Sequence, residues 1–204
     1  MKVAVLGIQG SGKGTQAQLL SQLTGWPCIA VGDLLRDEIK KGTKLGALLK
    51  SFLDKGDLAP DSLMFSLLLP FLHQTHFILD GYPRTLREAI LLDKDILLDR
   101  VIVLTLPDAE VYKRLAARRQ CEYCHAIYGL HMIPRRKDIC DLCGGKLFHR
   151  DDDQPEAIAE RLKIYHTETA YVIAHYQKKG IAATVDATLP VEIVFAEIRK
   201  LFKV

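Results

Sequence analysis

Several features that would mark a specialised class of protein are missing from this sequence. No run approaches the ~20 consecutive apolar residues that a helix needs to cross a bilayer. The formal net charge is only +3, too small to indicate nucleic acid or an anionic membrane as the main partner. Internal repeats and low-complexity segments are absent as well. The chain therefore predicts a globular protein that needs neither a membrane nor a nucleic acid as partner.

The composition is that of an ordinary folded protein. With 204 residues, 49% of them hydrophobic, the chain can bury one sizeable core and carry small inserted lobes. The apolar run Val3–Leu6 is short and ends in a glycine-rich turn, so it indicates a buried strand and not a signal peptide. A cytoplasmic location follows by default.

Short apolar runs alternate with segments of helical periodicity. The runs read as strands are Val3–Leu6, Cys28–Val31, Phe77–Leu79, Val101–Leu106 and Ile181–Val185. The helical segments are Gly14–Thr24, Gly32–Lys41, Asp61–His73, Ala109–Arg119, Pro155–Lys179 and Pro190–Phe202. Strands that are hydrophobic throughout and separated by helices are typical of a parallel sheet covered on both faces. The pattern predicts an α/β fold with a doubly wound, parallel five-stranded sheet.

Two regions interrupt this alternation and are expected to be inserted lobes. Residues 32–59 are helical with no strand, and residues 120–150 hold four cysteines among short turns. We expect a core domain of residues 1–29, 60–116 and 154–204. A nucleotide-binding lobe would span 30–59, and a lid would span 117–153.

A glycine-rich loop follows the first predicted strand and precedes a helix. Its sequence is Gly7-Ile8-Gln9-Gly10-Ser11-Gly12-Lys13-Gly14-Thr15. Such glycines let successive backbone N–H groups surround phosphate oxygens, and the helix adds its N-terminal dipole. Lys13 would supply charge to the outer phosphates and Thr15 a hydroxyl near a metal ion. The strict pattern GxxxxGK[ST] is missed by one residue, because Gly14 precedes Thr15.

Four of the five cysteines form two Cys-x2-Cys pairs. Cys121 and Cys124 are separated from Cys140 and Cys143 by fifteen residues, which is a zinc-ribbon pattern. Four thiolates around Zn²⁺ leave no open position for water, so the site would be structural. A lobe of about thirty residues cannot build its own core, and the metal would replace one. Cys28 stands alone in an apolar run and is expected to be a core residue.

Taken in order, the motifs resemble the adenylate kinase family of the bacterial type with a zinc-binding lid. After the glycine-rich loop come Gly32-Asp33-Leu34-Leu35-Arg36 and Leu79-Asp80-Gly81-Tyr82-Pro83-Arg84-Thr85. Arg114, Arg118 and Arg119 follow, then Arg150-Asp151-Asp152-Asp153, Arg161-Leu162 and Val185-Asp186-Ala187-Thr188. The resemblance covers essentially the whole chain. It implies a monomer that transfers the terminal phosphoryl group of ATP to AMP, with Mg²⁺ bound to ATP and Zn²⁺ in the lid.

The resemblance also implies roles for individual residues. The catalytic set is Lys13, Asp80, Arg84, Arg118, Arg150 and Arg161. The ATP-binding set is Gly10, Ser11, Gly12, Lys13, Gly14, Thr15, Arg114, Ile127, Tyr128 and Leu189. The AMP-binding set is Val31, Arg36, Asp57, Leu58, Ala59, Gly81, Tyr82, Pro83, Arg84, Glu88, Arg150 and Arg161. Asp80 would order water on Mg²⁺, and Asp152 and Asp153 would lie near the lid hinge and the phosphates.

Two departures from the family pattern fall where the acceptor base is expected. Val31 stands where AMP-specific members usually have Thr, and Glu88 stands where they have Gln. A Gln amide can donate to adenine N1 while it accepts from the 6-amino group, whereas an ionised Glu only accepts. Guanine, with N1–H and an amino group side by side, fits a carboxylate better. AMP is the expected acceptor by resemblance, and GMP or a pyrimidine monophosphate is the alternative.

Two further hypotheses belong to other classes of function. A zinc-ribbon, nucleic-acid-binding ATPase would share the loop and the cysteines, but no basic stripe with interleaved aromatic residues accompanies the ribbon. An inactive nucleotide sensor would lack some of the charged groups that transfer requires. Lys13 and all the matched arginines are present, so nothing supports the sensor.

Overall fold

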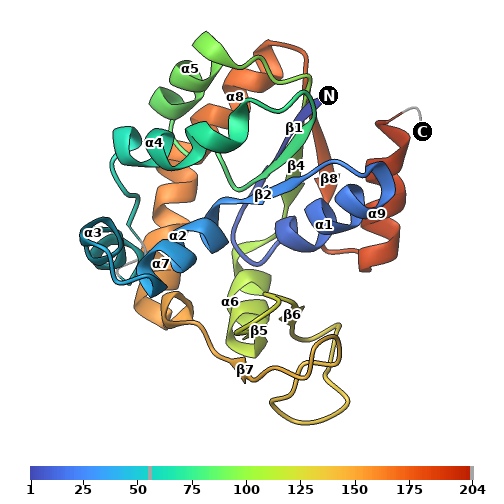
Figure 1. Cartoon of the computed structure of the whole chain (residues 1–204). Coiled ribbons are helices and arrows are strands. Elements are labelled where there is room, and N and C mark those ends of the chain that lie inside the picture. The colour runs from blue at the N-terminus through green and yellow to red at the C-terminus, as the bar shows by residue number, and fades with distance from the viewer. Residues whose placement is uncertain (55–56, 203–204) are drawn as a thin grey trace.

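The computed structural model describes residues 1–54 and 57–202. Residues 55–56 of the predicted nucleotide-binding lobe and residues 203–204 of the predicted core lie outside the described part. The predicted α/β fold is confirmed. Five parallel strands form one sheet in the order β2-β3-β1-β4-β8 (Figure 1). Their bounds are β1 Lys2–Gly7, β2 Cys28–Ala30, β3 Phe77–Asp80, β4 Arg100–Thr105 and β8 Ala182–Asp186.

Helices cover both faces of this sheet and bury a separate core on each. On one face, β1 side chains such as Ala4 and Leu6 pack with α4 (Asp61–Leu72), α5 (Leu86–Asp95) and α8 (Ala170–Lys178). On the other face, Val3 and Val5 pack with α1 (Lys13–Thr24) and α9 (Val191–Lys200). Because β1 is buried on both faces and lies at the centre of the sheet, the loop that leaves its carboxyl end is held rigidly.

The first insertion forms a helical lobe between β2 and α4. It consists of α2 (Val31–Lys40) and α3 (Lys44–Leu53), which lie against each other. Thr43 caps α3 by accepting a hydrogen bond from the Gly46 N–H. A Cβ at Gly46 would lie 2.3 Å from the carbonyl oxygen of Glu38, so only glycine permits this close approach of the two helices.

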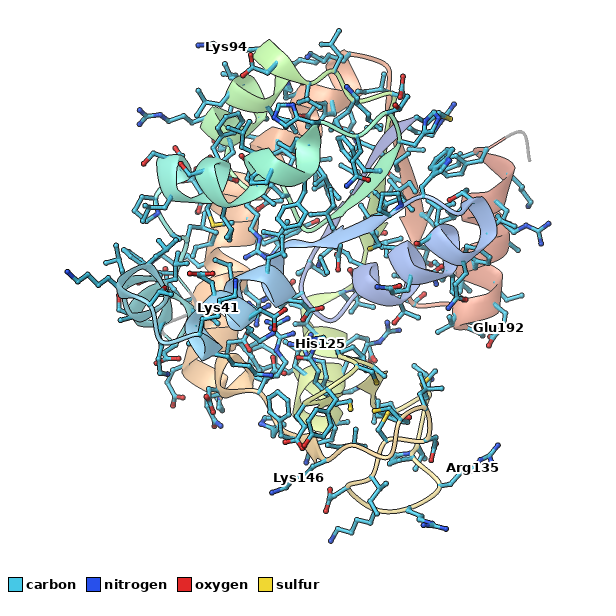
Figure 2. All side chains as sticks on the ribbon, viewed as in Figure 1. Lys41, Lys94, His125, Arg135, Lys146 and Glu192 are labelled. Carbon is cyan, nitrogen blue, oxygen red and sulfur yellow. The ribbon has the colours of Figure 1, made fainter. Side chains whose placement is uncertain are left out.

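The second insertion is the segment predicted to be the lid, and it projects from the carboxyl end of the sheet (Figure 1). The chain enters this insertion after α6 (Asp108–Ala117) and leaves it before α7 (Pro155–Ile164). Its strands β5 (Arg119–Cys121), β6 (Ile127–Tyr128) and β7 (Leu147–Phe148) form an antiparallel sheet in the order β6-β5-β7. Arg135 and Lys146 point outward from the lid, away from the rest of the molecule (Figure 2).

Three details differ from the sequence-based expectation. Val31, expected to end a strand, begins α2 instead. Helix α5 was not expected at all, and it begins at a capping box formed by Thr85 and Glu88. The single helix expected over Pro155–Lys179 contains a π-helical turn, Tyr165–Thr169, between α7 and α8. Within the described residues, no helix is both long and apolar enough to cross a membrane.

Candidate active site

A large cleft opens at the carboxyl ends of β1 and β3, between the core, the helical lobe and the lid. The glycine-rich loop forms its floor. Gly12 has φ 88°, a left-handed conformation that glycine adopts without strain, and it precedes the first residue of α1. A Cβ at Gly14 would lie 3.1 Å from Oδ2 of Asp80, so the extra glycine lets Asp80 approach the start of α1 closely. This close approach is a physical reason for the departure from the strict loop pattern.

Lys13 and Asp80 are buried together in the floor of the cleft. The Lys13 ammonium donates a hydrogen bond to the carbonyl oxygen of Ile8 at 2.8 Å. Burial lowers the pKa of Lys13 to about 7, although Asp80 acts in the opposite direction and Arg84 adds to the lowering. Burial likewise raises the pKa of Asp80 against the attraction of Lys13. The floor therefore holds cations in a place that favours an anionic ligand.

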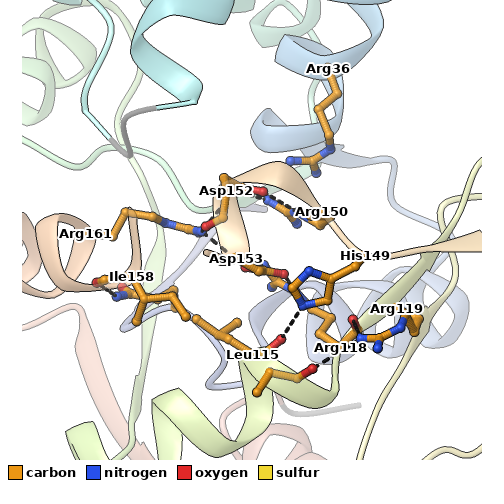
Figure 3. Close-up of polar contacts among 12 residues, drawn as sticks. Arg36, Leu115, Arg118, Arg119, His149, Arg150, Asp152, Asp153, Ile158 and Arg161 are labelled. Carbon is orange, nitrogen blue, oxygen red and sulfur yellow. Dashed lines mark hydrogen bonds and ion pairs between the residues drawn. The ribbon is translucent and has the colours of Figure 1, made fainter. Parts of the chain in front are cut away.

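Three arginines of the cleft are held by two buried aspartates at the point where the chain leaves the lid (Figure 3). Arg118 makes a two-point ion pair with Asp153, through Nε at 2.7 Å and Nη2 at 2.5 Å. Asp152 binds Arg150 in the same way and also accepts from Arg161 Nη1 at 2.9 Å. Such forks fix the plane of each guanidinium.

Asp152 remains ionised because of its arginine partners. Burial by itself would raise the pKa of Asp152, but the charges of Arg150 and Arg161 hold it well below its usual range. Asp152 and Asp153 are 4% and 3% exposed, so each replaces water as the partner of its arginine. The cleft thus has several positive groups whose orientation is set before any ligand arrives.

Two more arginines lie on the side of the helical lobe. Arg36 in α2 pairs with Asp33, one turn earlier in the helix. Its Nε and Nη1 atoms are buried and have no hydrogen-bond partner among the residues that the structure describes. Arg84, after β3, donates from Nε to the carbonyl oxygen of Gly81 at 2.8 Å. Both guanidiniums face the large cleft and leave donor groups for an anion there.

A smaller pocket opens beside Arg84, under α3. Its walls are mostly apolar and come from α2, α3, α4, α5, the loop between α3 and α4, and the segment after β3. The residues that line it are Leu35, Leu49, Phe52, Leu53, Asp57, Leu58, Ala59, Met64, Tyr82, Arg84 and Glu88. Leu58 and Arg84 line both cavities, so the small pocket adjoins the large one.

Most of the residues predicted for the site line one of these two cavities. The predicted residues that line the large cleft are Gly10, Gly12, Lys13, Gly14, Thr15, Arg36, Leu58, Asp80, Gly81, Pro83, Arg84, Arg114, Arg118, Ile127, Tyr128, Arg150 and Arg161. Those that line only the small pocket are Asp57, Ala59, Tyr82 and Glu88. Three predicted residues line neither. Ser11 and Val31 are buried, and Leu189 is exposed. Their predicted binding roles stay predictions.

Several residues that line the cleft were not predicted from the sequence. Gln120, on β5, and Met132, in the lid, face it, as does Tyr165 in the π-helical turn. Thr169, the last residue of that turn, donates from Oγ1 to the carbonyl oxygen of Arg84 at 3.0 Å. The π-helical turn has no signature in the sequence pattern, whereas Asp33 was visible within the Gly32–Arg36 motif.

The four cysteines of the lid form one cluster. Their sulfur atoms all lie within 4.8 Å of one another, and Cys121 and Cys140 are buried beneath Tyr128 and Leu147. A tetrahedral zinc site with Zn–S bonds of about 2.3 Å needs S–S separations of roughly 3.8 Å. Two pairs lie at 3.4 and 3.5 Å. A Cβ at Gly145 would lie 2.9 Å from Cys121 Sγ, so the cluster sits in a cradle that only glycine leaves open. The donor set fits Zn²⁺.

Comparison with known proteins decides the family. A family model described as "Adenylate kinase" matches residues 5–181. The chain belongs to the adenylate kinase family. A protein from Archaeoglobus fulgidus named "Adenylate kinase" is 42% identical, with 100% of this chain and 98% of the relative covered. Relatives of the same name from Methanocella arvoryzae and Lachnospira eligens are 41% and 39% identical, each with at least 97% of both chains covered.

Membership of the adenylate kinase family confirms the class of enzyme predicted from the motifs. The chain is a nucleoside monophosphate kinase. The relatives share one name and extend over essentially the whole chain, so neither a nucleic-acid-binding ATPase nor an inactive sensor is favoured. A preference for GMP or a pyrimidine monophosphate is not favoured either.

Proposed function

We propose that this chain reversibly transfers the terminal phosphoryl group of MgATP to AMP, giving two ADP. The observation that carries the proposal is the arrangement of cations in one cleft. Lys13 and six arginines from five separate segments line it together with the glycine-rich loop. Phosphoryl transfer depends mainly on positioning two phosphates and neutralising their charge, which such an arrangement provides.

The donor nucleotide would bind on the loop side of the cleft. The N–H groups of Gly10 to Thr15 and the N-terminus of α1 suit the donor phosphates. Arg114, whose Nη2 donates to the carbonyl oxygen of Ala187 at 2.9 Å, would flank the donor base with Ile127 and Tyr128. The backbone at Leu189 is a further predicted contact.

Mg²⁺ fits the oxygen groups that lie beside the loop. The Asp80 carboxylate and the Thr15 hydroxyl both line the cleft, and hard oxygen ligands are those that Mg²⁺ prefers. When bound with ATP, the ion would supply positive charge that offsets the charge of the phosphates. Asp80 would hold water on the ion, and Gly14 leaves the space for its carboxylate.

The acceptor would bind on the side of the helical lobe. Arg36 and Arg84 would hold the monophosphate, and the small pocket would hold the base. Lys13, Arg118, Arg150 and Arg161 would neutralise the transferring group between the two sites. Because Asp152 and Asp153 already fix three of these guanidiniums, little reorganisation is needed as charge develops. Transfer is direct, so no protein nucleophile takes part.

The two insertions would move as lobes around the core. Closure of the lid over donor and acceptor would exclude water and limit hydrolysis of ATP. Zn²⁺ held by the four cysteines would keep the lid rigid as it moves, a structural role without chemistry. The domain limits at 29/30, 59/60, 116/117 and 153/154 remain predictions, as do the monomeric state and the cytoplasmic location.

The first test is a coupled phosphotransfer assay with MgATP and each of AMP, GMP, CMP and UMP. We expect strong preference for AMP. The Lys13→Met variant should lose most activity, whereas Lys94→Met, on the exposed end of α5, should keep it. Absence of turnover with every acceptor would contradict the proposal, and a preference for another monophosphate would correct its substrate.

A further inference from the structure

The π-helical turn between α7 and α8 lies in the wall of the large cleft. Ile164, Tyr165 and Thr169 line the cleft there. The helices on either side of the turn pack in different clusters, Leu162 of α7 with side chains of α6 and Val172 of α8 with the core beside the sheet. Turns of this kind are rare and occur frequently at functional sites. The phosphoryl transfer described above uses no residue of this turn, so its place in the cleft wall needs an explanation.

The extra residue of the π turn changes which side chain faces the cleft. Arg161 in α7 lines the cleft, and so does Thr169 at the end of the turn. Each residue of a regular α-helix adds about 100° of rotation, so Thr169 would be turned roughly 80° away from the face that carries Arg161. A π turn holds one residue more than an α turn and takes this rotation back. Thr169 therefore returns toward the face of Arg161, where it is buried.

The hydroxyl of Thr169 forms its hydrogen bond outside its own helix. Its Oγ1 donates to the carbonyl oxygen of Arg84 at 3.0 Å, across 85 positions of the sequence. Threonine within a helix commonly donates to the carbonyl oxygen four residues earlier, and Thr167 in the same turn does so, to Lys163 at 3.0 Å. Two threonines of one turn thus differ in the partner of their hydroxyl. Only the buried one joins the turn to another part of the cleft.

Arg84 belongs to the proposed acceptor site and is held by three different segments. Its backbone N–H donates to Oε2 of Glu88 at 2.6 Å, and its Nε donates to the carbonyl oxygen of Gly81 at 2.8 Å. The bond from Thr169 holds its carbonyl group. Both ends of the Arg84 backbone and one nitrogen of its side chain are therefore fixed before a ligand binds.

Resting on the proposed acceptor site, we infer that Thr169 is a positioning residue for phosphoryl transfer. Its hydroxyl fixes the Arg84 carbonyl, and through the backbone it sets the direction from which the guanidinium meets the monophosphate. A guanidinium binds phosphate through a planar fork, so its affinity depends on that direction. The π turn serves this contact, because it turns Thr169 toward the cleft wall.

Thr169→Val removes the hydroxyl and keeps the shape of the side chain. KM for AMP should rise roughly 3- to 10-fold, the loss expected for one net hydrogen bond. KM for MgATP should stay within about twofold, because the glycine-rich loop holds the donor phosphates. Thr169→Ser, which keeps the hydroxyl, should bring KM for AMP to within about twofold of the wild type. The matched control is Thr167→Val, which should change neither KM because that hydroxyl bonds its own helix.

A double-mutant cycle separates positioning from a merely structural role. Arg84→Lys replaces the fork with a point charge on a flexible stem, which depends less on the direction of the backbone. If Thr169 acts through the guanidinium, adding Thr169→Val to Arg84→Lys should raise KM for AMP by less than about twofold. If Thr169 only supports the fold, the second substitution should cost as much in this background as in the wild type.

The experiment measures kcat and KM for AMP and for MgATP in the wild type, the single variants and the double variant. Circular dichroism and Tm check the fold of each protein. An unchanged KM for AMP in Thr169→Val would overturn the inference. So would an equal rise in KM with and without Arg84→Lys, or no recovery in Thr169→Ser.

Two further points keep the outcome clear. If Thr169→Val does not fold, Thr169→Ala removes the same hydroxyl with less bulk, and the same rise in KM for AMP is expected. Good turnover of AMP by the wild type with the contrary pattern in the variants would refute only this inference. No turnover of AMP by the wild type would refute the proposed function as well.

Discussion

Gln120 of the lid donates a hydrogen bond from Nε2 to Oδ1 of Asp33 in α2, over 3.0 Å. Asp33 also pairs with Arg36, so one carboxylate links the lid to a predicted ligand of the acceptor phosphate. Nearby, Lys40 donates to the carbonyl oxygen of Glu122 at 3.1 Å. His125 lies beside these contacts and faces α2 (Figure 2). The lid and the helical lobe therefore touch along a seam of polar contacts, which runs from residues 120–125 to residues 33–40.

This seam should couple the two substrates. In Gln120→Ala, the affinity for AMP should gain less from a bound, non-hydrolysable ATP analogue, because closure of one lobe no longer stabilises the other. We expect the coupling to fall by roughly 1 kcal/mol, about fivefold in affinity, as for one net hydrogen bond. Calorimetric titration of AMP with and without the analogue measures it. Arg136→Ala, on the exposed part of the lid, is the control. Unchanged coupling in Gln120→Ala would show that the seam is incidental.

The paired aspartates should be needed for both stability and rate. Asp153→Asn removes the charge that holds Arg118 and leaves a largely buried guanidinium without this ionic partner. We expect the free energy of unfolding to fall by about 3 kcal/mol and kcat by roughly 10- to 100-fold. Asp151→Asn, an exposed neighbour, should change neither quantity. Denaturant unfolding and steady-state kinetics on both variants separate the effects, and a wild-type kcat in Asp153→Asn would contradict this role.

Lys13 should take up a proton when ATP binds. Its pKa is about 7 in the free protein, chiefly because of burial, and nearby phosphates would raise it. At pH 6 the group is already charged, so uptake should be small. At pH 8 it is mostly neutral before binding and charged afterwards, so uptake should approach one proton. Calorimetry in buffers of different ionisation enthalpy measures this number. Lys13→Arg, which cannot deprotonate, should show no such rise with pH. Equal proton uptake at pH 6 and pH 8 would refute the predicted protonation of Lys13 on ATP binding.

Removal of the lid metal should affect stability more than intrinsic chemistry. We expect about one Zn²⁺ per chain by elemental analysis, and Cys124→Ser should lower both zinc content and Tm. Cys28→Ser, outside the cluster, should keep its zinc. Below the Tm of the variant, kcat for AMP should stay within roughly tenfold of the wild type, because the cluster lies outside the cleft. A stable Cys124→Ser protein with no measurable kcat would indicate a catalytic metal instead.

The sequence was a good guide to the elements and a poor guide to how they meet. Buried parallel strands are apolar along their length, so all five could be found, although their order could not. Helix α5 was missed, even though Thr85 and Glu88 have the spacing of a capping box, because Glu88 was interpreted only as a contact to the base. A residue type does not reveal that it serves two purposes.

The candidate site shows the same limit. The arginines could be named from their motifs, and the acidic pair could be expected nearby. Which aspartate holds which arginine depends on the path of the chain out of the lid. The bond from Gln120 to Asp33 joins residues 87 positions apart, and no local pattern marks it. Long-range pairs of this kind are fixed by packing and not by propensity.

The capping box at the start of α5 also limits how this protein could evolve. Glu88 accepts two backbone hydrogen bonds at the start of the helix, whatever nucleobase the pocket holds. Mutations that would reshape the pocket with an apolar side chain would therefore lose the helix cap at the same step. Exchange of the carboxylate for an amide would keep an oxygen that can accept these bonds, so it is the change in the chemistry of the pocket that would cost the helix least.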